Sequence, residues 1–147
     1  MVAALIAAIV FFIFLKKKES IADFSYVKTI VENSINSDRM EESTGRFFKK
    51  YYGLNSEDFD GVLLYAPVSN MDAEEVLLVK CKTDEQAENL VDIIEERQQT
   101  KENTFAGYAP EQYDLCQNYI LDQQGHYIIF IVSGDAETID AAFKGSL

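Results

Sequence analysis

The sequence contains one histidine, two cysteines, and 13 basic residues against 25 acidic ones. Because nucleic-acid phosphates need a cationic surface, the formal net charge of −12 argues against a DNA or RNA partner. Cys81 and Cys116 lie far apart, and neither has a second cysteine or histidine at zinc-ligand spacing. The two could pair outside the cytoplasm, but Cys81 ends an apolar run and is better explained as a small buried residue.

Motifs that carry catalytic chemistry are missing as well. His126 is expected at the start of a strand beside a turn, where a histidine is ordinarily solvated. The sequence has no glycine-rich phosphate loop, no GxSxG and no HExxH. Residues 55–61 superficially suggest a calcium loop, but aligning Gly61 with the loop glycine places Pro67 where a bidentate glutamate is needed. We therefore expect no catalytic residue, no metal site and no cofactor.

One long apolar run stands at the beginning of the chain. Residues 2–15 are all apolar and three lysines follow at once, which predicts a membrane-anchor segment over residues 1–19. The expected anchor residues are Val2, Leu5, Ile9, Phe12 and Leu15, with Lys16, Lys17 and Lys18 among the lipid headgroups. No lipid-attachment cysteine and no small-x-small cleavage site follow the run, which favours an uncleaved single-pass anchor over a removed signal peptide. A buried N-terminal helix is the alternative.

The residues leave the orientation of this anchor open. Three lysines after the apolar run and none before it would keep the domain in the cytoplasm by the positive-inside rule. Basic residues upstream of Met1, if the chain begins earlier, would reverse that orientation.

Hydrophobic spacing predicts two short helices within a helical lead-in over residues 20–55. Apolar residues at helical intervals predict the first helix over residues 23–36. The second helix carries two aromatic i,i+4 pairs, Phe47 with Tyr51 and Phe48 with Tyr52, and Gly53 supplies a left-handed stop. We expect these aromatic rings in the core.

Residues 56–147 are predicted to form an α+β domain built from two strand–strand–helix units. The expected strands are 62–65, 76–79, 119–121 and 127–132, and the expected helices begin at Thr83, with Gln86 in the capping-box position, and at Asp135. Two such units can form one mostly antiparallel four-stranded sheet with both helices on one face. Because residues 127–132 are apolar throughout, this strand should be buried on both faces, and the two N-terminal helices or a partner should cover the second face.

Several short motifs are similar to those of a known family. They are Met71-x-Ala73-Glu74-Glu75-Val76, Val79-Lys80-Cys81-Lys82, Glu96-Arg97, Phe105-x-Gly107-Tyr108-x-Pro110-x-Gln112 and Gly125-x-Tyr127. In this order, over residues 45–144, the chain resembles DUF4358, an uncharacterised domain family whose members look like membrane-anchored or lipoprotein-type proteins of Gram-positive bacteria. The resemblance implies a protein of the cell membrane with its domain outside the cytoplasm, which is opposite to the orientation that the three lysines predict. It implies no activity.

The segment from Phe105 to Gln112 is the candidate binding or loop-structuring region. Phe105 and Tyr108 are expected to seat this connector on the sheet, and Pro110 to fix the following turn. Arg97, at the end of the preceding helix, is expected to pair with an acidic loop residue or to cap carbonyls. In the functional interpretation Arg97, Tyr108 and Gln112 line a pocket for a peptide or glycan; in the structural one they only hold the connector.

From the sequence we expect a noncatalytic binding or protein-interaction module at the cell envelope, held in lipid by its N-terminal helix. Its partner would be an envelope protein, a peptide or a glycan. One alternative is a cell-envelope enzyme that uses acidic residues, and another is a structural subunit of an envelope assembly. Two carboxylates sharing a raised pKa in a cleft would favour the enzyme, whereas a flat apolar or aromatic patch would favour the binding module.

Overall fold

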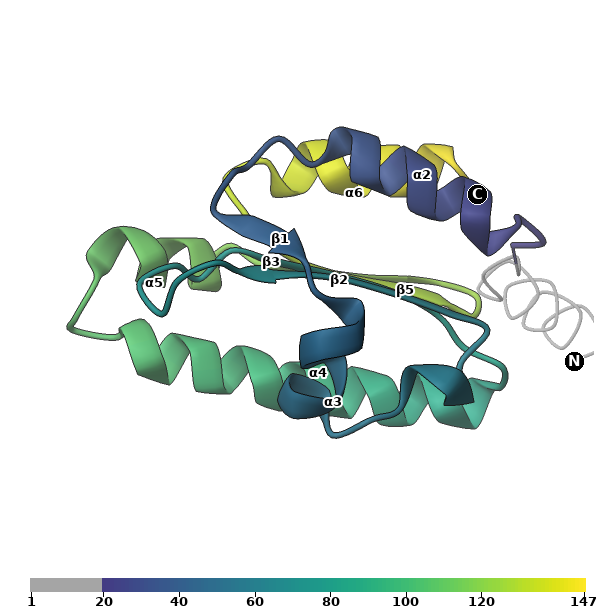
Figure 1. The fold of residues 1–147 in the computed structure, drawn as a ribbon, viewed down its shortest axis with the longest axis horizontal. Helices are drawn as coiled ribbons and strands as arrows, with labels where there is room; N and C mark the ends of the chain where they lie inside the picture. The colour runs from purple at the N-terminus through teal and green to yellow at the C-terminus, as the bar shows by residue number, and fades with distance from the viewer. Residues whose placement is uncertain (1–19) are drawn as a thin grey trace, which may run out of the picture.

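The computed structural model describes residues 20–147 (Figure 1), so the anchor predicted over residues 1–19 lies outside the described residues. The described part of the chain is an α+β fold with five α-helices, one short 3₁₀ helix (Ser56–Asp58) and five strands. None of the helices within residues 20–147 is both long enough and apolar enough to cross a bilayer.

The five strands form one fully antiparallel sheet. They are β1 (Met40–Glu42), β2 (Gly61–Pro67), β3 (Glu75–Lys80), β4 (Ile120–Gln124) and β5 (Tyr127–Val132). Their order is β1-β2-β3-β5-β4, so the two most buried strands, β3 and β5, are neighbours near the middle. All residues of β5 are buried, which confirms the prediction that this strand is covered on both faces.

The helices cover the sheet on both sides. Their bounds are α2 (Phe24–Ser34), α3 (Thr44–Tyr52), α4 (Asp84–Phe105), α5 (Pro110–Gln117) and α6 (Ala136–Gly145). Helices α2 and α6 lie on one face, and α3, α4 and α5 lie on the other, giving three layers (Figure 1). Side chains alternate between the faces of a strand, so Leu77 packs toward α4 while Leu78 packs toward α2 and α6.

The prediction that the helices after β3 and β5 share one face is wrong. Residues such as Leu90 on α4 join one core, and residues such as Ile139 on α6 join the other. Both faces of β3 and β5 are apolar, and α4 with α3 and α5 already covers one of them. The remaining face exposes Val76 and Leu78 unless another helix packs there, which is the place that α6 and α2 take.

The four-strand prediction is also corrected, because β1 adds a fifth strand at the edge beside β2. This strand is three residues long and only Met40 is buried, so the alternation of apolar and polar residues is too short to predict a strand from the sequence. It lies within the predicted helical lead-in, between α2 and α3. The aromatic pairs of α3 are found as predicted, with ring centroids 5.1 Å apart for Phe47–Tyr51 and 5.6 Å for Phe48–Tyr52.

Helix α4 is longer than its pattern suggested. It begins as predicted, with the Thr83 hydroxyl accepting a hydrogen bond from the Gln86 backbone N–H at 3.1 Å. The sequence predicts that this helix ends near Arg97, but the polar stretch 98–104 continues it to Phe105. Gln98 and Lys101 are buried there, because their side-chain nitrogens donate to the carbonyl oxygens of Cys116 and Ala73. Burial of polar residues with partners hides a helix from hydrophobic periodicity.

Candidate functional site

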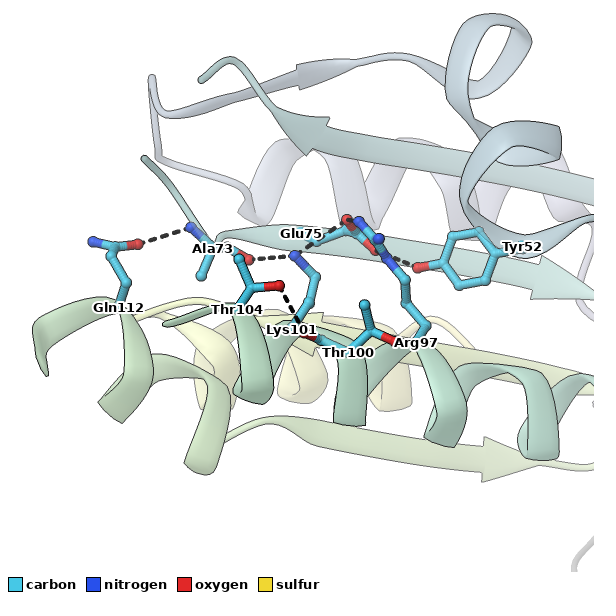
Figure 2. Close-up of polar contacts among 8 residues, drawn as sticks. All are labelled: Tyr52, Ala73, Glu75, Arg97, Thr100, Lys101, Thr104 and Gln112. Atoms are coloured by element: carbon cyan, nitrogen blue, oxygen red, sulfur yellow. Dashed lines mark hydrogen bonds and ion pairs between the residues drawn. The ribbon is translucent and has the colours of Figure 1, made fainter. Parts of the chain in front are cut away.

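A buried carboxylate at the start of β3 is the centre of the candidate site. Glu75 is fully buried. Residues two apart in a strand lie on the same face, so the Glu75 side chain faces α4, as the Leu77 side chain does. Arg97 reaches it with two bonds, Nη2 to Oε1 at 2.7 Å and Nε to Oε2 at 3.2 Å (Figure 2). Lys101 Nζ lies 3.3 Å from Oε1, and the Tyr52 hydroxyl donates to Oε2.

Local structure explains why these groups meet. Arg97 and Lys101 are four residues apart on α4, so both side chains project toward β3. Tyr52 is the last residue of α3, which contacts both α4 and strand β2. Just before the strand, the Ala73 backbone is held twice: its carbonyl accepts from Lys101 Nζ, and its N–H donates to Gln112 Oε1, each at 2.8 Å. Side chains from α3, α4 and α5 therefore all bind residues at the start of β3 or just before it.

Burial and charge shift the pKa values of the groups in this cluster in different directions. Burial opposes ionisation of Glu75, but Lys101 and Arg97 together lower the pKa of its carboxyl below the ordinary value. Burial and the Glu75 charge raise the pKa of Tyr52 well above its ordinary value. The pKa of Arg97 is raised, because its bonds to Glu75 outweigh burial, which acts in the opposite direction. Burial lowers the pKa of Lys101 below its ordinary value, although the Glu75 charge acts in the opposite direction. With Arg97 and Lys101 charged, the cluster holds two cations and one anion.

A small pocket opens beside this cluster, and we call it the Arg97 pocket. Its volume is about 150 Å³, and its walls are Arg97, Lys101, Thr100, Thr104 and Phe105 of α4, Tyr51 of α3, Pro67 at the end of β2, and Ser69, Asn70 and Asp72 from the β2–β3 connection. The Arg97 guanidinium lies 4.0 Å from the centre of the Tyr51 ring, which fixes its plane. A second hollow of about 280 Å³ shares Tyr51, Arg97 and Thr100 with it.

Exposed apolar side chains lie near the pocket on two loops, and we call Val68, Met71 and Tyr108 the apolar rim. Their exposed fractions are 50%, 57% and 61%, respectively. The Tyr108 hydroxyl lies 3.1 Å from Met71 Sδ, so the β2–β3 loop and the α4–α5 loop touch. These loops are at the end of the molecule where α5 lies, and the described chain begins at the opposite end (Figure 1).

The five candidate residues predicted from the sequence have different environments in the structure. Arg97 and Phe105 line the pocket, but Arg97 is well inside α4 and pairs with the strand residue Glu75 instead of an acidic loop residue or a helix end. Tyr108 is exposed and contacts Met71 instead of seating the connector on the sheet. Pro110 begins α5 at a position where its missing N–H costs nothing, and Gln112 turns inward to the Ala73 backbone.

Sequence reasoning missed Glu75, Lys101 and Tyr52. A signal was available for Glu75, because a carboxylate beside the apolar run 76–79 requires a buried cation, and Arg97 with Lys101 at i,i+4 supplies two. Tyr52 was interpreted as an apolar core residue, and its ring does pack there. The partner of its hydroxyl could not be read from periodicity.

A different pair of carboxylates lies between β4 and α6. Lys144 Nζ is 2.9 Å from Asp140 Oδ2 and 3.7 Å from Asp122 Oδ2. Burial raises the pKa of Asp140 and outweighs the opposing effect of Lys144, and the neighbouring Asp122 raises it further. This pair belongs to the α6 side of the sheet, away from the Arg97 pocket on the α4 side. Within residues 20–147, no group of three or more His, Cys, Asp or Glu side chains is placed to hold a metal ion.

These features define a three-layer α+β domain with a buried ion-pair cluster beside a small pocket. The family model described as "Domain of unknown function (DUF4358)" matches residues 33–133, and the chain belongs to this family, as its motifs predicted. The matched range includes all five strands and the complete ionic cluster, and it ends before α6. The comparison with curated proteins finds no match, and neither does the comparison with solved structures.

Proposed function

We propose that this protein is a noncatalytic binding module of the cell envelope, anchored in the membrane by residues 2–15, which binds its ligand at the Arg97 pocket and the apolar rim. The ligand would be part of an envelope protein, a peptide or a glycan. The observation that carries the proposal is the pocket itself, which holds a fixed guanidinium, together with the exposed apolar side chains on the β2–β3 and α4–α5 loops.

The protonation states of the cluster support binding over acid–base catalysis. A general acid or base works best with a pKa near the operating pH. The pKa of Glu75 is instead lowered and that of Tyr52 is raised, so both groups keep one protonation state around neutral pH. Burial likewise raises the pKa of the Cys81 thiol to about 12, which leaves it a poor nucleophile.

The attachment of the N-terminal segment supports a binding end that faces away from the membrane. The Ala22 carbonyl accepts from the Tyr127 hydroxyl at 2.6 Å and from Lys80 Nζ at 3.3 Å, which fixes the start of the described chain to one end of the sheet. The β2–β3 and α4–α5 loops, which carry the apolar rim and part of the pocket wall, lie at the other end (Figure 1). An anchor preceding residue 20 would therefore leave this surface accessible to a partner.

Site-specific photocrosslinking in native membranes tests the proposed surface. A photoreactive phenylalanine analogue at Tyr108 should crosslink the full-length protein to one reproducible envelope protein, peptide or glycan. Tyr26 is the matched control, because it is 56% exposed and belongs to α2 on the opposite layer. Equal products from both positions, or none from position 108, would contradict the proposal.

Protease treatment of intact cells tests the localisation separately. If the domain is extracytoplasmic, as we propose, added protease removes it while a cytoplasmic marker survives. Survival of the domain in intact cells, with digestion after lysis, would place it in the cytoplasm.

A further inference from the structure

We infer that the group recognised in the Arg97 pocket is a carboxylate carrying a single negative charge. The inference rests on the proposed function, because it names the chemistry of the ligand at the same site. It is argued from the charge balance of the pocket, from the donors that Arg97 and Lys101 keep free, and from the size of the pocket.

The charges around the pocket leave one cation uncompensated. Glu75 balances only one of Arg97 and Lys101. Asp72 also lines the pocket, but it pairs with Arg39, whose Nη1 lies 3.5 Å from Asp72 Oδ1. Together with Arg39, which lies outside the pocket, these groups sum to one positive charge, in a chain whose formal net charge is −12. Glu96 lines the adjoining hollow and not the Arg97 pocket. A bound carboxylate would neutralise that excess, because it brings one negative charge.

Free hydrogen-bond donors remain on the same two cations. Arg97 has five N–H groups, and its two bonds to Glu75 use Nε and one hydrogen of Nη2. The outer edge of the guanidinium, Nη1 with the second Nη2 hydrogen, is the fork that binds carboxylates with two parallel bonds. Lys101 donates to the Ala73 carbonyl and pairs with Glu75, which leaves one of its three hydrogens.

The size of the pocket and the surrounding charge favour a carboxylate over a phosphate. A volume of about 150 Å³ corresponds to a few water molecules, which suits a carboxylate with a short aliphatic part. A phosphate ester brings between one and a half and two negative charges, roughly, at neutral pH. That charge exceeds the single excess cation and would lie next to Asp72. The apolar rim is available for whatever follows the carboxylate.

The experiment titrates the full-length protein in lipid nanodiscs with N-acetylalanine, using the Arg97 Nε–H signal in nitrogen–proton NMR spectra as the readout. The neutral isostere N-acetylalaninamide, acetate and inorganic phosphate are the comparison probes. We expect N-acetylalanine to shift the Arg97 signal and to bind at least about tenfold more tightly than the amide, since only the acid pairs with the guanidinium. Acetate binding as tightly as N-acetylalanine would identify a free acid, and weaker acetate binding would identify the end of a peptide.

A charge variant checks the same inference without removing any residue of the ionic cluster. Asp72→Asn removes the competing carboxylate from the pocket wall and should tighten N-acetylalanine binding by about two- to fivefold. Asp92→Asn is the matched control, since Asp92 is exposed on α4 and does not line the pocket. Equal affinity for the acid and the amide, tighter binding of phosphate, or no response to either carboxylate would overturn the inference. Crosslinking from position 108 would still succeed in that case, so the two failures are distinguishable.

Discussion

Arg97 and Glu75 form a two-point ion pair between α4 and β3, in which the carboxylate is fully buried and the guanidinium retains 16% side-chain exposure. The buried partner therefore depends on the cations for its charge, whereas the guanidinium still reaches the pocket. The Arg97–Glu75 ion pair therefore has two roles. It holds α4 against the start of β3, and it orients the guanidinium that lines the candidate site.

Replacing Glu75 by glutamine should destabilise the protein strongly. Glu75→Gln leaves Arg97 and Lys101 without their counter-charge, and breaking a buried pair in this way costs about 3–5 kcal/mol. The free energy of unfolding can be measured by urea titration followed by circular dichroism at pH 7. Glu88→Gln, at an exposed position of α4, should change it by no more than about 0.5 kcal/mol.

The pH dependence of the same variant follows from the direction of the shift. Because the pKa of Glu75 is lowered in the fold, its stabilising contribution is complete above the ordinary pKa of a glutamic acid and is lost as the pH falls through the folded value. The difference between wild type and Glu75→Gln should therefore narrow between pH 7 and pH 3. A constant difference over this range would show that Glu75 acts by packing alone.

Tyr52→Phe tests the hydroxyl bond to the same carboxylate. The variant keeps the ring in the core but removes a hydrogen bond to a charged group, which contributes about 1.5–3 kcal/mol. Tyr51→Phe is the control, because Tyr51 contacts Phe47 and Arg97 through its ring. Similar losses in the two variants, measured by urea unfolding, would contradict a specific role for the Tyr52 hydroxyl.

Two glycines should respond in opposite ways to substitution by alanine. A Cβ at Gly61 would collide with the Phe24 ring, so Gly61→Ala should destabilise the fold by about 1–3 kcal/mol. Among the described residues, open space surrounds a Cβ at Gly45 on α3, and Gly45→Ala should stabilise the fold by about 0.5–1 kcal/mol. Adding Phe24→Ala to Gly61→Ala should cost less than the two single changes summed, because the collision is then absent.

Asp140→Asn should stabilise the protein at neutral pH. The raised pKa of Asp140 means that its charged form is disfavoured in the fold, and this cost appears as the pH rises from the ordinary aspartic acid value through the folded pKa. The gain from the substitution should therefore be present at pH 7 and vanish near pH 3. Thermal unfolding across this range, with exposed Asp38→Asn as the control, measures it. A loss of stability at pH 7 would mean that the contact with Lys144 dominates.

Both cysteine thiols should be unreactive in the folded protein. Cys81 and Cys116 are free and buried, and burial raises the pKa of each thiol, that of Cys81 to about 12. A disulfide-exchange reagent at pH 8 should modify them slowly in buffer and completely in denaturant. Rapid modification of the native protein would show local opening of α5 or of the loop after β3.

The elements that sequence reasoning predicted correctly are those whose signal is local. The i,i+4 aromatic pairs of α3, the Thr83 cap and the apolar runs of β2, β3 and β5 each depend on residues close together in the chain. Strand β1 and the second half of α4 were missed because their stability comes from distant partners. Met40 is buried by the α2–α6 layer, and the Gln98 side-chain nitrogen donates to a carbonyl 18 residues away.

The sequence by itself determined the family, the α+β class, the need of the strand at residues 127–132 for cover on both faces, and the acidic character of the domain. The family follows from short sequence motifs, and the other properties follow from composition and short-range periodicity, none of which depends on how the layers are stacked. Only the tertiary structure decided that α4 and α6 take opposite faces and that Tyr52, Glu75, Arg97 and Lys101 converge. A buried carboxylate can be paired by any cation that the fold brings within a few ångströms, and that choice is made by packing.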